Sequence, residues 1–155
     1  MTMADRDIRR AWPPEAAAPL DDEQLAACYA IDDRGRRALR MNFVSSVDGA
    51  ATAGGLSGGL SSVADKRVFD ILRRLCDVVL VGAGTVRAEG YGAMRLDPDA
   101  VQWRRANGLA DHPVFAIVSG TLGLDPRSAV FTDAPVRAVM VTVGASAQER
   151  KEAFS

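Results

Sequence analysis

Apolar residues recur along this chain with two different periods, and the changes of period predict the elements of an α/β fold. Apolar and polar residues alternate between Leu39 and Phe43, which predicts a strand over 39–47. Apolar positions at three- and four-residue steps then predict a helix over 62–76. The continuous apolar run 78–81 is typical of a strand covered on both faces. This order of strand, helix and strand predicts a parallel βαβ unit with a right-handed crossover.

The alternation of strand and helix patterns continues toward the C-terminus. Short apolar runs predict strands over 114–119 and 136–143, with a loop between them at 120–131. Ser146 and Glu149 then have the spacing of a capping box, which predicts the start of another helix.

The N-terminal part of the chain has a different character. Residues 1–36 are polar and rich in alanine and proline, which predicts a mostly irregular leader. Within it, Asp21 or Asp22 is placed to cap a short helix that ends near Tyr29. We therefore expect a polar leader with one short helix, followed by a single α/β domain over 37–155.

Composition narrows the classes of partner. The chain is 48% hydrophobic and 25% charged, and 19 basic residues against 20 acidic ones give a net charge of −1. This balance argues against nucleic acid or a membrane surface as the main partner. There is no apolar run of membrane-spanning length and no signal peptide, which predicts a cytoplasmic protein. Two cysteines and one histidine, His112, have no metal-ligand spacing, so we expect reduced thiols, a structural or solvated histidine and no metal site.

Candidate chemistry lies where two of the predicted strands end. The segment 82–85, with the sequence G-A-G-T, directly follows the run 78–81. Glycine amides can approach a phosphate or a ribose, Thr85 adds a hydroxyl, and the guanidinium of Arg87 suits a phosphate. Ligands of open α/β sheets bind at the carboxyl ends of strands. The spacing matches neither the G-x-G-x-x-G fingerprint nor a P-loop, so a plain structural turn stays an equal alternative.

The second candidate is the S-S-V-D-G segment at 45–49, where the strand predicted at 39–47 ends. Asp48 offers a carboxylate that can bind a ligand or order the following loop, and its spacing alone favours a turn-forming Asp-Gly. The loop 50–59 that follows contains four glycines. Such a loop either lets the backbone approach a ligand closely or is merely flexible.

Taken together, these motifs resemble the reductase domain of the riboflavin-pathway deaminase-reductase family. The resemblance rests on N-F-V-S-S-V-D-G-A-A-T at 42–52, on G-L-S at 55–57 and on D-V-V-L-V-G-A-G-T-V-R-A-E-G-Y-G at 77–92. The resemblance covers about residues 37–143. Within the family, the sequence is similar to the stand-alone, actinobacterial-type pyrimidine reductases, which lack the deaminase domain. It implies a dihydrofolate-reductase-like α/β fold, with a mixed, mostly parallel sheet flanked by helices.

The resemblance also implies a site for NADPH and a site for a pyrimidine ribosyl phosphate. The residues that it places at the cofactor are Val44, Gly82, Gly84, Thr85, Glu89 and Ser119. Those that it places at the substrate are Ser57, Arg73 and Arg95. Asp48 would lie near the nicotinamide and the pyrimidine ring, as the catalytic candidate. For Arg73, the helix pattern alone favours a solvated side chain.

The implied activity is NADPH-dependent reduction of a ribosylaminopyrimidine, of the 5-amino-6-(5-phosphoribosylamino)uracil reductase type, by a cytoplasmic homodimer. Two departures from the family pattern qualify it. The family's G-x-S-K-W is G-L-S-G-G at 55–59, and its later E-G-G-x-x-L segment and closing strands are not found, so we expect a sheet that is incomplete at the C-terminus. The alternatives are a non-catalytic fragment of the same family and a dihydrofolate- or pterin-type reductase.

Overall fold

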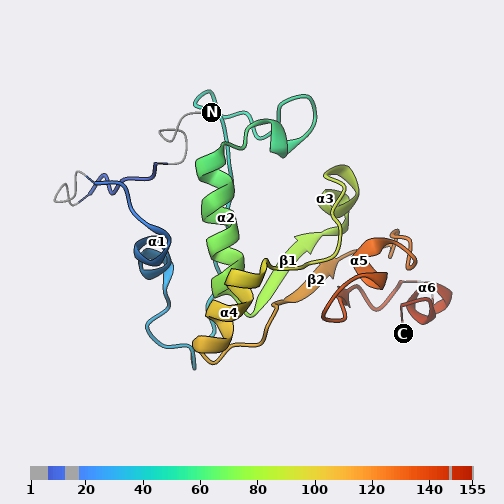
Figure 1. Ribbon diagram of the computed structural model, residues 1–155. Coiled ribbons are helices and arrows are strands. Elements are labelled where there is room, and N and C mark those ends of the chain that lie inside the picture. The colour runs from blue at the N-terminus through green and yellow to red at the C-terminus, as the bar shows by residue number, and fades with distance from the viewer. Residues whose placement is uncertain (1–6, 13–17, 147, 155) are drawn as a thin grey trace. The chain divides into compact units, whose positions relative to one another are not determined.

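The computed structural model describes residues 7–12, 18–146 and 148–154 (Figure 1). The chain divides into two compact units, residues 1–75 and 76–155, and each is described by itself. The N-terminal unit contains α1 (Asp22–Tyr29), the 3-10 helix η2 (Ser57–Gly59) and α2 (Val63–Leu75). The C-terminal unit contains β1 (Val78–Gly82), α3 (Ala83–Ala88), α4 (Pro98–Ala106), β2 (Val114–Val118), α5 (Ala129–Thr132), β3 (Val139–Val141) and α6 (Gln148–Glu152).

The N-terminal unit is built on the packing of α1 against α2. A complete capping box begins α1: the Asp21 carboxylate accepts from the backbone N–H of Gln24 at 2.8 Å, and the Gln24 side chain accepts from the backbone N–H of Asp21 at 3.0 Å. Leu25 of α1 and Ile71 of α2 are both buried in the small core between these helices. The two helices predicted in this part of the chain are therefore confirmed.

The strand predicted at 39–47 is wrong. This segment lies within the described part of the chain and has no regular secondary structure. Most of its apolar side chains are turned to solvent, with Leu39 and Phe43 each 82% exposed, whereas Val44 is half-buried. Alternation defines two faces for an extended segment, but a strand also needs a neighbour that completes its backbone hydrogen bonds. The predicted βαβ unit consequently lacks its first strand.

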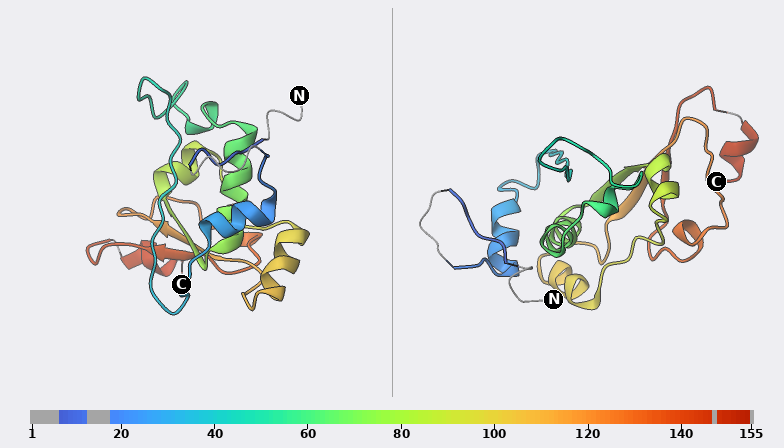
Figure 2. Two further views of the ribbon diagram at one scale, coloured as in Figure 1. Left: turned by 90° about the vertical axis from the view of Figure 1, so that its left-hand side faces the viewer. Right: turned by 90° about the horizontal axis from the view of Figure 1, so that it is seen from above.

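The C-terminal unit contains a parallel three-stranded sheet in the order β1-β2-β3. Figures 1 and 2 show β1 and β2 side by side and running in the same direction. Val78 is the register partner of Val114, and Ala116 is the partner of Val139. The strands predicted at 78–81 and 114–119 and the predicted α/β class are confirmed. The third strand occupies only part of the predicted range 136–143.

One face of this sheet forms the main core of the unit. Phe115 and Ile117 of β2 are 1% and 0% exposed, and they pack with Ala83 and Val86 of α3 and with Val130 of α5. Because side chains alternate along a strand, their neighbours in sequence point to the opposite face.

The opposite face of the sheet carries branched aliphatic side chains that are open to solvent. They are 43–57% exposed and comprise Val78, Leu80, Val118, Val139 and Val141. The apolar run 78–81 predicted a strand covered on both faces, and the structure covers only one of them. A continuous apolar run therefore shows that both faces are hydrophobic, without showing that both are buried.

Helix α4 was not predicted from the sequence, although its start carries clear signals. The Asp97 carboxylate accepts from the backbone N–H of Ala100 at 2.8 Å, and Pro98 occupies the first turn. Near the end of α4, Arg104 is 1% exposed and donates to the carbonyl oxygens of Ala110 at 2.6 Å and Cys76 at 2.7 Å. This buried guanidinium ties α4 to the segments that precede β1 and β2.

The last helix begins differently from the prediction. Helix α6 starts at Gln148, and residue 147 lies outside the described residues. The hydroxyl of Ser146, predicted to cap this helix, instead donates to the carbonyl oxygen of Gly120 at 2.8 Å and lies 2.6 Å from the Thr142 hydroxyl. Ser146 thus joins the segment after β3 to the loop after β2.

Candidate functional site at the carboxyl edge of the sheet

The carboxyl ends of β1 and β2 lie next to each other. Gly82, the last residue of β1, is the register partner of Val118, the last residue of β2. Helix α3 begins directly after Gly82, and Ser119 directly follows Val118. The structure therefore brings the segment 82–89 and Ser119 to one edge of the sheet, where parallel α/β sheets bind their ligands.

The G-A-G-T segment, for which a turn was one expectation, starts a helix. Gly82 has an extended backbone, with φ −76° and ψ 141°, and precedes the first turn of α3. Ala83 and Val86, three residues apart, are buried against the sheet, and this packing favours a helix over a glycine loop. A side chain placed on Gly82 or Gly84 would meet no atom within 4 Å, so there is open space beside both backbones.

Two predicted cofactor residues share one side of α3. Thr85 and Glu89 are four residues apart, which places their side chains one above the other on a helix. The helix ends there, with the backbone N–H of Glu89 donating to the carbonyl oxygen of Thr85 at 2.9 Å. Thr85 is exposed and Glu89 is half-buried. Ser119 is 6% exposed, and its backbone N–H donates to the carbonyl oxygen of Val141 at 2.9 Å.

Arg87, for which a phosphate was one expected partner, makes a contact within the protein. Its Nη1 donates to the carbonyl oxygen of Gly123 at 3.0 Å and so joins α3 to the loop that follows β2. No signal in the sequence marks this contact, because it depends on the conformation of the loop.

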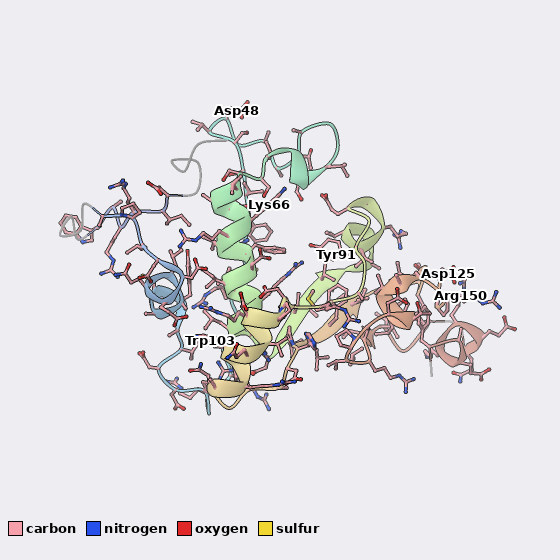
Figure 3. The ribbon with its side chains drawn as sticks, in the orientation of Figure 1. Asp48, Lys66, Tyr91, Trp103, Asp125 and Arg150 are labelled. Atoms are coloured by element: carbon pink, nitrogen blue, oxygen red, sulfur yellow. The ribbon has the colours of Figure 1, made fainter. Side chains whose placement is uncertain are left out.

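Asp48 lies on an exposed turn of the N-terminal unit (Figure 3). The Ser46 hydroxyl donates to its carboxylate, and the backbone N–H of Ala50 donates to the Ser46 hydroxyl at 2.9 Å. Gly49 completes the turn with φ +87°, which glycine adopts without strain. The hydrogen bond from Ser46 and those from the backbone N–H groups of Asp48 and Ala50 hold the pKa of Asp48 below its ordinary value of 3.8. Asp48 is therefore an acceptor at neutral pH and not a proton donor.

The small-residue loop 50–59 is an ordered turn. Ala53 and Leu56 form an isolated bridge, and the two residues between them, Gly54 and Gly55, have φ of +62° and +84°. Two adjacent positive φ values are the geometry of a tight primed turn, which explains the glycine pair. Ser57, predicted at the substrate, follows this turn, begins η2 and is half-buried. Val44, predicted at the cofactor, is half-buried in the extended segment before the Asp48 turn.

The two arginines predicted at the substrate lie in different units. The guanidinium of Arg73, near the end of α2, lies 4.0 Å from the centroid of the Phe69 ring, so this half-buried side chain is not simply solvated. Arg95 follows α3 and donates to the carbonyl oxygen of Asp133 at 2.8 Å. The candidate residues thus fall into two groups. Val44, Asp48, Ser57 and Arg73 belong to the N-terminal unit, and Gly82, Gly84, Thr85, Glu89, Arg95 and Ser119 to the C-terminal unit.

His112 has a structural role, as one of the two readings of the sequence predicted. Its Nδ1 accepts from the backbone N–H of Leu96 at 3.2 Å. This bond requires a neutral imidazole in which Nδ1 carries no proton. Burial, followed by the positive charge of Arg95, lowers the pKa of His112 from 6.5. Within residues 7–12, 18–146 and 148–154, no three His, Cys, Asp or Glu side chains gather as metal ligands. In the same part of the chain, no helix is both long and apolar enough to cross a membrane.

A hollow of the C-terminal unit lies apart from these residues. It has a volume of about 360 Å³ and is lined by Leu122, Arg137, Ala138, Val139, Met140, Thr142, Lys151 and Phe154. None of the candidate residues lines it, so the site at the sheet edge rests on strand ends and on α3.

The fold and the site define an α/β protein whose parallel sheet carries one group of candidate ligand-binding residues at its carboxyl edge. Residues 37–155 match the RibD C-terminal domain, and the chain belongs to that family. A similar solved structure is a pyrimidine reductase-like protein from Corynebacterium diphtheriae, with a TM-score of 0.65 and 27% sequence identity. The match covers 72% of this chain and 48% of that one, so this chain spans about half the length of its structural relative. No curated protein sequence matches this chain.

Proposed function

We propose that this chain forms part of an NADPH-dependent reductase of a ribosylaminopyrimidine, of the 5-amino-6-(5-phosphoribosylamino)uracil reductase type in riboflavin biosynthesis. The observation that carries the proposal is the match of residues 37–155 to the RibD C-terminal domain. The similarity to a pyrimidine reductase-like protein supports the same reaction class. We further propose that the protein works in the cytoplasm as a homodimer.

The residues at the sheet edge suit a nucleotide cofactor. Open space beside Gly82 and Gly84 lets a ligand approach the backbone, and the exposed Thr85 hydroxyl can both donate and accept hydrogen bonds. The Glu89 carboxylate can accept hydrogen bonds from ribose hydroxyl groups. In this proposal NADPH, when bound, supplies the hydride, and the protein supplies orientation and electrostatics. Ser119 at the same edge, and Val44 of the N-terminal unit, are the other residues that the family resemblance assigns to the cofactor.

The residues proposed for the substrate carry cationic and acceptor groups. Arg73 and Arg95 carry guanidinium groups, which form strong charge-assisted hydrogen bonds with a phosphate. Ser57 adds a hydroxyl for the ribosyl phosphate. Asp48, a carboxylate at neutral pH whose pKa the hydrogen bond from Ser46 lowers further, can accept hydrogen bonds from N–H groups of the pyrimidine.

A fluorescence titration of the purified chain with NADPH tests the cofactor assignment. We expect a saturable change in cofactor fluorescence, and we expect Thr85→Ala to weaken the affinity by about fivefold, the value of one lost hydrogen bond. Thr85→Ser keeps the hydroxyl and should bind as the wild type does. Absence of binding at millimolar NADPH would contradict the proposal and favour a non-catalytic fragment of the family. An unchanged affinity in Thr85→Ala would remove Thr85 from the site.

A further inference from the structure

The loop of residues 119–124, which follows β2 at the candidate site, has an unusual backbone. Leu122 has φ +52°, in the left-handed region, and its side chain is 1% exposed. A leucine is disfavoured there because its Cβ comes too close to the following carbonyl oxygen. Such a conformation persists only where the surroundings hold it.

Two side chains from other elements hold the backbone on either side of Leu122. The Ser146 hydroxyl donates to the carbonyl oxygen of Gly120 at 2.8 Å, and Nη1 of Arg87 donates to the carbonyl oxygen of Gly123 at 3.0 Å. Leu124, at the end of the loop, is 8% exposed and belongs to the core of the unit. The 119–124 loop is thus fixed by its own leucines, by the segment after β3 and by α3.

Arg87 is placed on α3 to hold this loop and not to join the ligand. Each residue of a helix turns by about 100°, so side chains two apart point to nearly opposite sides. Arg87 is two residues from Thr85 and two from Glu89. Its side chain therefore points away from the side of α3 that those residues share. The helix consequently has one side for the proposed ligand and another for the 119–124 loop.

We propose that Arg87 is a positioning residue. It holds the 119–124 loop, and with it Ser119, in a fixed position relative to Thr85 and Glu89. The consequence for binding rests on the proposed function, because it concerns NADPH. The competing assignment for an arginine at this edge is direct contact with the phosphate on the adenosine ribose of NADPH. The two assignments differ in a measurable way, since NADPH carries a phosphate on the adenosine ribose that NADH lacks.

The first experiment needs no cofactor. Thermolysin cleaves before bulky apolar residues, so native-state cleavage before Leu122 and Leu124 reports opening of the loop. We expect Arg87→Met to speed this cleavage by about fivefold, because one hydrogen bond is lost. Arg87→Lys, which retains a donor, should keep it slow, and Arg150→Met, on the exposed surface of α6 (Figure 3), should leave it unchanged. An unchanged cleavage rate in Arg87→Met overturns the proposal.

The second experiment compares NADPH with NADH on the same variants. A positioning role predicts that Arg87→Met lowers the affinities for NADPH and NADH by the same factor, about fivefold. Arg87→Lys should bind both cofactors with the affinities of the wild type. A loss confined to NADPH overturns the proposal and makes Arg87 a phosphate ligand. If the wild type binds neither cofactor, the proposed function fails, while the cleavage rates still decide whether Arg87 holds the loop.

Discussion

Several arginine side chains in the C-terminal unit donate to backbone carbonyl groups. Arg87 donates to Gly123, Arg95 to Asp133, and the buried Arg104 to Ala110 and Cys76. A guanidinium has five donors and stays charged, so it can satisfy carbonyl groups that irregular segments leave outside helices and strands. An arginine near a candidate ligand site is therefore weak evidence for an anion until its contacts are known.

His112 gives a prediction at the same scale. Its folded-state pKa lies below 6.5, so the neutral ring contributes stability that is fully present above about pH 6.5 and is lost as the pH falls toward the folded-state pKa. Asparagine at this position keeps an acceptor for the Leu96 N–H and does not titrate. We expect the free energy of unfolding of His112→Asn to fall less than that of the wild type between about pH 6.5 and 5. Urea unfolding at several pH values across this range measures the free energy of unfolding of both proteins. Parallel pH profiles would show that His112 is not the source of the pH dependence.

At the scale of elements, the starts of helices are set by single side chains. Asp97 caps α4 through its bond to the backbone N–H of Ala100, whereas Asp99 lies in the first turn without being the cap. We expect Asp97→Ala to lower the free energy of unfolding by about 1 kcal/mol. Asp99→Ala, which loses only an interaction with the helix dipole, should cost about 0.3 kcal/mol. Urea denaturation compares the two variants, and equal losses would mean that the cap is not the cause.

Elements that depend on neighbouring residues could be predicted from the sequence. Elements that depend on contacts with residues far away in sequence could not. Short stretches of sequence contain the signals for four elements. These are the capping box of α1, the periodicity of α2 and the apolar runs of β1 and β2. Helix α3 was missed because its glycines favour a loop, and the packing of Ala83 and Val86 on the sheet overrides that preference. The segment 39–47 has the pattern of a strand, but pairing depends on residues far away in sequence.

The candidate site follows the same division. The carboxyl end of the strand at 78–81 could be located from its apolar run, which placed the G-A-G-T segment at a sheet edge, whereas Ser119 came from the family resemblance. The contact of Arg87 with Gly123 spans 36 residues and depends on the left-handed backbone of Leu122, which no spacing encodes. Roles at the ligand came from family resemblance and stay predictions.

At the scale of the whole molecule, one face of the sheet carries branched aliphatic side chains that are open to solvent. Leu80 is 57% exposed on β1, which forms one edge of the sheet, and Val141 is 43% exposed on β3, the other edge. Apolar edge strands favour association with further chains because their backbone groups and side chains both seek partners.

We therefore expect the wild type to self-associate as its concentration rises. Leu80→Lys places a charge on the edge strand and should weaken association by about tenfold, or 1.4 kcal/mol. Gln148→Lys adds the same charge on the exposed surface of α6 and should associate as the wild type does. Sedimentation velocity over a range of concentrations measures the difference, and equal weakening by both substitutions would point to net charge as the cause.

The order β1-β2-β3 has a consequence for how the C-terminal unit is made. Each of these strands adds to the outside of the strand synthesised before it, and the helices between them are short. The described sheet can therefore grow on the ribosome in the direction of translation, because no later strand has to insert between strands that are already paired. The core around Phe115 and Ile117 then begins to form as soon as β2 has emerged, and β3 only extends it.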